Sequence, residues 1–337
     1  MSDSEISTAN TMRERAGESR AKLWILLGAR RLVVTGVIAV IFFVMFVIAG
    51  TLLYPPLKSE IAQTDTIETM FSTMIGATIT GTTLVVTISQ LVISQENGPL
   101  GDQRQRMSDA MDFRSFVGEM LNQTTPSDPS AFLQQLINVT ERRANELSDS
   151  ITESDNEELR AELDEFADSL TGNADTVKDQ LDGAKFGTFD VLFAALNFNY
   201  SWKIFHVERM RNEYADDLTD EQHRLFERLK TSLTMFGPAR EHIKTLYFQW
   251  ALIDLSQLIL YAAIPALFVA GAMLAFVGSG TFTGTTLGVT DILWVVSGAF
   301  TVTLLPFMLL VSYILRIATV AKRTLAIGPL ILRNSQR

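Results

Sequence analysis

Residues 32–54 read LVVTGVIAVIFFVMFVIAGTLLY, a run that contains no Asp, Glu, Lys or Arg. Three further runs, at 70–93, 255–277 and 292–315, are equally free of charge. A helix needs about 20 such residues to cross ~30 Å of hydrocarbon. A soluble domain could bury one helix of this kind but hardly four, so the sequence predicts an all-α protein with four transmembrane helices in contact with the lipid bilayer.

The polar residues are concentrated in one block, 95–247, which is long enough for a domain of its own. Between Glu141 and Asp182 this block carries 14 acidic and 4 basic residues, a net charge of −10 that equals the charge of the whole chain. Such a surface repels polyanions, so we expect no nucleic-acid partner. Only 8 of the 28 basic residues are Lys, and acidic, Lys-poor surfaces resemble those of salt-adapted, halophilic archaeal proteins. Cysteine is absent, which excludes disulfides, thiolate metal sites and cysteine nucleophiles.

The basic residues near the ends of the apolar runs predict the orientation. Six precede the first run, whereas the loop at 55–69 holds one and the loop at 278–291 holds none. Cytoplasmic segments are the ones enriched in Lys and Arg, so both termini and the central block should be cytoplasmic in a multi-pass protein of the cell membrane. The predicted order is a basic tail (1–31), a first transmembrane hairpin (32–54 and 70–93), a helical domain (95–247), a second hairpin (255–277 and 292–315) and a basic tail (316–337).

The central domain should be helical, because its apolar residues recur at spacings of three and four. These residues are Leu133, Ile137, Ala144, Leu147, Ile151, Leu159, Leu163, Phe166, Leu170, Val177 and Leu181. They predict a helical hairpin or short coiled coil with an acidic outer face. A third helix should run from about Thr188 to beyond Val207. Thr219 and Gln222 form a capping-box pair that should start another helix, ending at Gly237-Pro238, and Pro238 can open the next helix, which continues into the third span.

Residues with catalytic or metal-binding potential are few. His206, His223 and His242 lack the spacing that places two metal ligands on one helix face. The glycine-rich run at 278–284 lacks a phosphate-loop lysine and is better explained as a flexible hairpin, and the acidic residues at 153–168 lack EF-hand spacing and are better explained as a solvated helix face. We therefore expect no enzyme, no cofactor and no metal.

The second span is the least apolar of the four. Small and polar residues recur along it at spacings of three and four and so share one helix face: Ser72, Gly76, Thr80, Thr83, Thr87, Gln90 and Ser94. Two interpretations remain open. Thr80, Thr83, Thr87, Gln90 and Ser94 could line a water-filled path, or the small residues could allow close packing of helices. Asp254 and Arg316 lie at matching depths in the third and fourth spans, which predicts an intramembrane ion pair.

The run from Gly76 to Thr83, with the exit Ser94-Gln-Glu-Asn-Gly-Pro-Leu100, resembles the signature helix of an uncharacterised group of prokaryotic polytopic membrane proteins. This resemblance covers about 30 residues and implies no function. The order of spans and insert is also similar to that of the bestrophin anion channels. The pore-neck residues and the acidic calcium clasp of that family cannot be placed on this sequence, so the similarity is one of topology only.

Two functional hypotheses from different classes follow. The first is a homo-oligomeric ion channel or pore with the second span innermost, because four helices of one protomer could not easily enclose a path lined by a single polar face. The alternative is a non-conducting scaffold or regulator, anchored in the membrane, whose helical domain binds a cytoplasmic protein. A membrane enzyme ranks third, since no nucleophile, metal set or cofactor loop can be named.

Overall fold

The computed structural model describes residues 22, 24–53, 57, 61, 65–96, 98–152, 154–185, 188–278 and 280–324. The predicted tails before residue 22 and after residue 324 lie outside these residues. Nine α-helices make up almost all of the described structure, and four of them are long and apolar enough to cross a membrane. The all-α, four-span prediction is therefore confirmed.

The chain divides into two compact units. One, here called the membrane unit, comprises residues 24–97 and 249–319, and the other, the insert unit, comprises residues 98–248 with the described residues 22 and 320–324. Each unit is described by itself below. Helix α11 (Asp220–Phe276) contributes its first part to the insert unit and the rest to the membrane unit.

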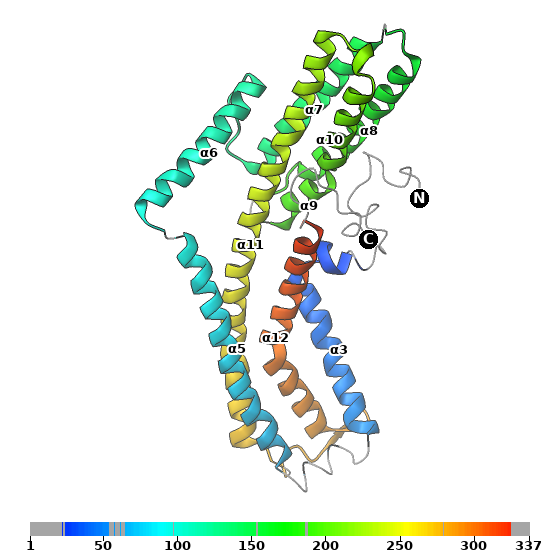
Figure 1. The fold of residues 1–337 in the computed structure, drawn as a ribbon. Coiled ribbons are helices and arrows are strands. Elements are labelled where there is room, and N and C mark those ends of the chain that lie inside the picture. Colours follow the sequence, from blue (N-terminus) through cyan, green and yellow to red (C-terminus); the bar gives the residue numbers. More distant parts are fainter. Residues whose placement is uncertain are drawn as a thin grey trace. The chain divides into compact units, whose positions relative to one another are not determined.

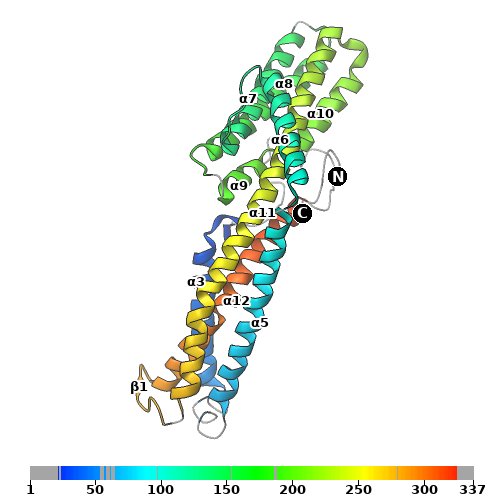
Figure 2. The same cartoon turned by 90° about the vertical axis from the view of Figure 1, so that its left-hand side faces the viewer.

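The membrane unit contains the four long helices, which run alongside one another (Figures 1 and 2). They are α3 (Arg31–Leu52), α5 (Thr66–Glu96), the apolar part of α11, and α12 (Asp291–Arg323). A short π-helix, Trp24–Gly28, precedes α3. Between α11 and α12 lies a small antiparallel β-hairpin of β1 (Thr285–Thr286) and β2 (Val289–Thr290). The sequence analysis explained the glycine-rich run at 278–284 as a flexible hairpin, whereas the β-hairpin comes directly after this run. The left-handed backbone of Leu287 and Gly288 forms its turn.

The core of the membrane unit consists of two clusters along the helices. One brings Phe71 of α5 together with Met273 of α11 and Val296 of α12. The other brings Val85 of α5 together with residues of α11 and α12, among them Leu255. Both clusters thus pack the same three helices against each other, and this fixes which side of α5 faces its own chain.

The insert unit is a helical bundle. Its helices are α6 (Leu100–Leu121), α7 (Pro129–Ile151), α8 (Glu157–Leu181), α9 (Phe189–Asn197), α10 (Tyr200–Glu213), a 3₁₀ turn (Ala215–Asp217) and the first part of α11. Side-chain N-caps start α7 and α8, where Asp128 accepts from the backbone of Ala131 at 2.9 Å and Asn156 from that of Leu159 at 3.0 Å. All eleven apolar residues of the predicted hairpin are buried between α7, α8 and their neighbours, so the hairpin is confirmed.

Two helix boundaries in the insert unit differ from the prediction. The third helix is broken into α9 and α10 at Phe198 and Asn199, both of which are buried. The helix that begins at the confirmed Thr219–Gln222 capping box does not end at Gly237-Pro238, because α11 continues for 57 residues. A Cβ on Gly237 would lie 3.2 Å from the Tyr200 ring, so the glycine allows a close contact rather than ending the helix.

Candidate functional site

One side of α5 is buried against the protomer's own helices. Its buried residues are Ile67, Phe71, Thr78, Val85 and Ser89, spaced by four or seven. Ser89 is hydrogen-bonded to Ser256 of α11, and Val85 packs with Leu255, Ile259 and Leu309. The intramolecular packing of the second span is therefore made by a face that the sequence analysis did not single out.

The predicted polar face lies on the opposite side. All seven of its residues are exposed: Ser72, Gly76, Thr80, Thr83, Thr87, Gln90 and Ser94. At 3.6 residues per turn this polar face is centred about 160° around the helix from the buried face. Packing within one protomer consequently does not explain it, and the polar face points away from α3, α11 and α12.

Hydrogen bonding differs along the polar face. The hydroxyls of Thr83 and Thr87 donate to the carbonyls four residues earlier, each at 2.9 Å, and that of Ser94 donates to Leu91 at 2.8 Å. These hydroxyls are satisfied within the helix. Within the described residues, the side chains of Thr80 and Gln90 make no hydrogen bond. An unmatched amide is costly in hydrocarbon, so Gln90 requires water or a polar partner from outside its own protomer.

The predicted ion pair is not made within the described residues. Asp254 is exposed on α11 and forms no salt bridge there, whereas Arg316 is buried and donates to the carbonyl of Ala29. The equal depths read from the sequence gave no information on rotation about each helix. Asp254 lies on an exposed face of α11, whereas Arg316 lies on a buried face of α12. The carbonyl of Ala29 therefore accepts the hydrogen bond that we expected the Asp254 carboxylate to accept.

Arg31, which the sequence analysis assigned to the basic tail, is a buried residue of the membrane unit. Its guanidinium donates to Ala29 at 2.7 Å, to Ile25 at 2.8 Å and to Ser312 of α12 at 3.2 Å, in each case to the backbone carbonyl. These acceptors on the N-terminal side of α3 exist because the π-helix stops before α3 begins and leaves carbonyls outside a continuous helix. Arg31 and Arg316 thus join the start of α3 to α12. In the sequence, Arg31 is only a basic residue next to an apolar run, and this pattern predicts a residue of the cytoplasmic tail.

The insert unit contains a buried polar network that the sequence also did not reveal. The ammonium of Lys203, which is fully buried, donates to Asn173 at 2.7 Å and lies 4.6 Å from the centre of the Phe198 ring. Asn173 donates to the carbonyl of Asn197 at 3.0 Å. In the sequence, Asn173 looks only like part of an interruption in the helical pattern. This network joins α8, the α9–α10 break and α10, and it serves the packing of the bundle.

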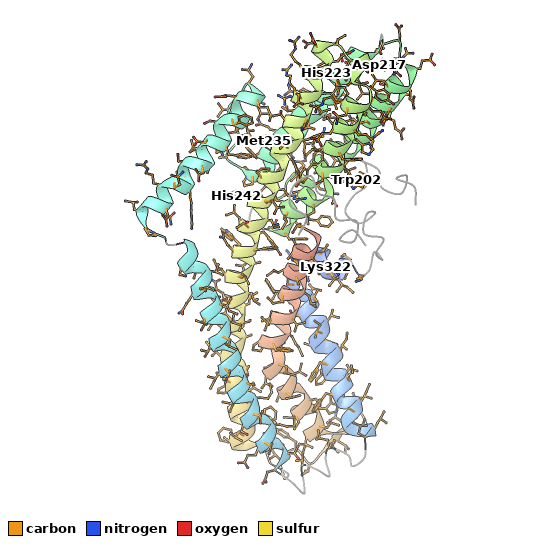
Figure 3. The ribbon with its side chains drawn as sticks, in the orientation of Figure 1. Trp202, Asp217, His223, Met235, His242 and Lys322 are labelled. Carbon is orange, nitrogen blue, oxygen red and sulfur yellow. The ribbon has the colours of Figure 1, made fainter. Side chains whose placement is uncertain are left out.

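The histidines are dispersed over the insert unit. Figure 3 shows His223 and His242 at separate positions along α11, while His206 of α10 lies 6.0 Å from the ring of Trp202. Among the residues that the structure describes, no three His, Asp or Glu side chains gather in an arrangement that could hold a metal ion.

Comparison with known proteins gives a family without an assigned function. The whole chain, residues 1–337, matches the family of unknown function DUF7972, and it belongs to that family. No curated protein matches the chain. No solved structure matches it either.

Proposed function

Since the family carries no assigned function, the geometry of α5 is the best guide, and from it we propose that the protein is an oligomeric membrane channel or pore. Several copies surround a path that the polar face of α5 lines, with Thr80, Thr83, Thr87, Gln90 and Ser94 in contact with water. The observation that carries this proposal is the exposure of all seven residues of the polar face on the side opposite the protomer's own core.

The physical argument concerns what can cover the polar face. Hydrocarbon would leave the Gln90 amide without a hydrogen-bond partner, at a cost of roughly 2–7 kcal/mol for transfer of such a group from water. Other copies of the chain, or water held between them, can supply partners. Gly76 leaves open space on the polar face, because a Cβ built at this position meets no atom within 4 Å. A closely approaching neighbour or a column of water fits this surface better than lipid does.

The orientation completes the proposal. The distribution of basic residues supports an orientation with both termini and the insert unit in the cytoplasm. The path then runs from the α5 end at Thr66 on the outer side to the Ser94 end on the inner side.

Conductance of the protein in liposomes tests the proposal. Thr83→Leu and Gln90→Leu replace polar groups of the path with bulk, so they should lower conductance at least several-fold while elution on gel filtration stays unchanged. Ile88→Leu is the matched control, because Ile88 is also exposed on α5 but lies away from the polar face, and it should conduct like the parent. A parent protein that conducts no ion at any voltage would exclude the channel.

A second candidate function rests on α6. Leu100, Met107 and Met111 lie on one side of this helix and are 86%, 64% and 48% exposed. An unpartnered apolar stripe of this kind fits a scaffold that binds a cytoplasmic protein helix. The number of copies in mild detergent separates the two functions: four or more favours the channel, whereas one or two favours the scaffold.

A further inference from the structure

A half-open cavity of about 330 Å³ lies between α5, α11 and α12 of the membrane unit. Its walls include Met74, Gly81, Ile259, Phe307 and Leu310, so they are mostly apolar. The volume is about ten times the ~30 Å³ that one water molecule occupies in the liquid, and apolar cavities of half this size stay dry and bind benzene. It also falls within the ~300–1,000 Å³ range of small-molecule sites.

One hydroxyl in the cavity wall lacks a partner. The Oγ1 atom of Thr82 is buried and makes no hydrogen bond within the described residues. Its neighbour Thr83 shows the usual alternative, donation to the carbonyl four residues earlier. A buried hydroxyl without a hydrogen bond destabilises the folded protein. A ligand that hydrogen-bonds to Thr82 removes this cost, and the gain contributes to its binding free energy.

A proline inside α12 lies in the same region. Pro306, which also lines the cavity, lies inside α12 and has no N–H. Half-unwound or proline-interrupted helices at mid-membrane depth are a common setting for ligand sites in membrane proteins.

A second, more open cavity lies next to this deeper one along α5. It has a volume of about 490 Å³ and is lined by Asp65, Thr66, Thr69, Met70, Thr73, Met74 and Phe300. Met74 lines both cavities, so together they follow α5 from its first turn to Val85.

We propose that the deeper cavity binds a small amphiphile, an alcohol with an apolar body of on the order of ten carbons, judged from the size of benzene cavities. The hydroxyl of the ligand bonds to Thr82, and its apolar body lies against Met74, Ile259 and Leu310. The site is on the flank of α5 away from the polar face, so it does not depend on the proposed permeation path.

Photolabelling of the purified full-length protein with a diazirine derivative of 1-octanol tests this site. Illumination should label residues of α5 and α12 around the cavity, as mapped by peptide mass spectrometry. The labelling should saturate, and unlabelled 1-octanol should compete better than octane, which cannot bond to Thr82. Gly81→Leu should lower the labelling at least fivefold, because its side chain enters open space in the cavity.

Two further variants keep the test decisive. Leu84→Phe enlarges an exposed side chain that is not part of the cavity and should leave the labelling unchanged. Thr82→Val preserves shape and should remove the preference for octanol over octane, which tests the site even if Gly81→Leu fails to fold. Labelling spread over the lipid-facing side chains, or equal in the parent and Gly81→Leu, would overturn the proposal. Displacement of the probe by phospholipid but not by octanol would also overturn it, since the occupant would then be a lipid tail.

Discussion

The contact between Gly237 and Tyr200 predicts opposite effects for two glycine-to-alanine substitutions in the insert unit. In Gly237→Ala the new Cβ would lie 3.2 Å from Cε2, 3.3 Å from Oη and 3.4 Å from Cζ of Tyr200. Optimal separations of non-bonded carbons are ~3.5–4.0 Å. In Gly172→Ala, on α8, the new Cβ meets no atom within 4 Å.

The sign of the first effect depends on whether the tyrosine can move. Tyr200 is 4% exposed, its ring centre lies 5.8 Å from that of Phe236, and the Arg240 guanidinium covers it at 4.8 Å. Overpacking of a site held in this way costs about 1–3 kcal/mol. The gain from replacing glycine inside a helix is about 0.5–1 kcal/mol. Gly237→Ala should therefore destabilise the protein by about 1 kcal/mol, while Gly172→Ala should stabilise it by about 0.5–1 kcal/mol.

Thermal unfolding of the full-length protein in detergent measures both changes. Tryptophan fluorescence is a suitable signal, because Trp202 is buried in the insert unit. A change of 1 kcal/mol corresponds to a shift in Tm of roughly 2–4 °C for a domain of this size. Tyr200→Leu removes the ring that the new Cβ at position 237 would meet, so Gly237→Ala should cost less in that background. The reasoning would be refuted if the two glycine substitutions raised Tm equally.

Three further predictions concern topology, the membrane unit and pH. In intact cells an impermeant thiol reagent should label Ser59→Cys and Thr283→Cys but not Ser150→Cys, and external labelling of Ser150→Cys would contradict the cytoplasmic insert. Arg316→Gln should destabilise the protein by about 1.5–3 kcal/mol, because it removes a hydrogen bond from a charged donor to the carbonyl of Ala29, to which Arg31 also donates. Asp254→Asn should change stability by less than about 0.5 kcal/mol, and a large loss measured by thermal unfolding would restore the ion pair. Burial lowers the pKa of Lys178, but hydrogen bonds to Asp175 and Glu141 outweigh this effect and raise the pKa above 10.5. The stabilisation of the folded state by the charged Lys178 is therefore complete below pH 10.5 and is lost as the pH rises through the higher folded pKa. In urea titrations, the loss of stability between pH 8 and pH 11 should be smaller for Lys178→Met than for the parent.

The sequence predicted elements whose signal is periodic. Four uncharged runs gave the four long helices, and the spacing of residues such as Leu147 and Leu163 gave the buried seam of α7 and α8. The Thr219–Gln222 capping box was likewise readable, because its signal is local. Periodicity and local capping therefore accounted for the fold class and most helices.

The remainder depended on contacts between residues distant in sequence. Gly237-Pro238 looks like a helix end, and only the Tyr200 ring opposite shows why glycine is needed within α11. The sequence predicts Arg31 as a tail residue, and only the structure shows that the carbonyls of the π-helix and of Ser312 accept its hydrogen bonds. The polar face of α5 was found from its spacing, but spacing alone could not tell whether this face or the one through Val85 packs against the protomer.

Cross-linking of single cysteines on α5 tests the central claim most directly. The native chain contains no cysteine, so Thr83→Cys, Ile88→Cys and Val85→Cys can each be treated in isolated membranes with a bismaleimide. Thr83 lies on the polar face, Ile88 on an exposed apolar side, and Val85 in the protomer's own core. If the polar faces of several copies meet, Thr83→Cys should give covalent dimers in high yield and the other two should not. A Thr83→Cys protein that stays monomeric, or that dimerises no better than Ile88→Cys, would contradict the claim.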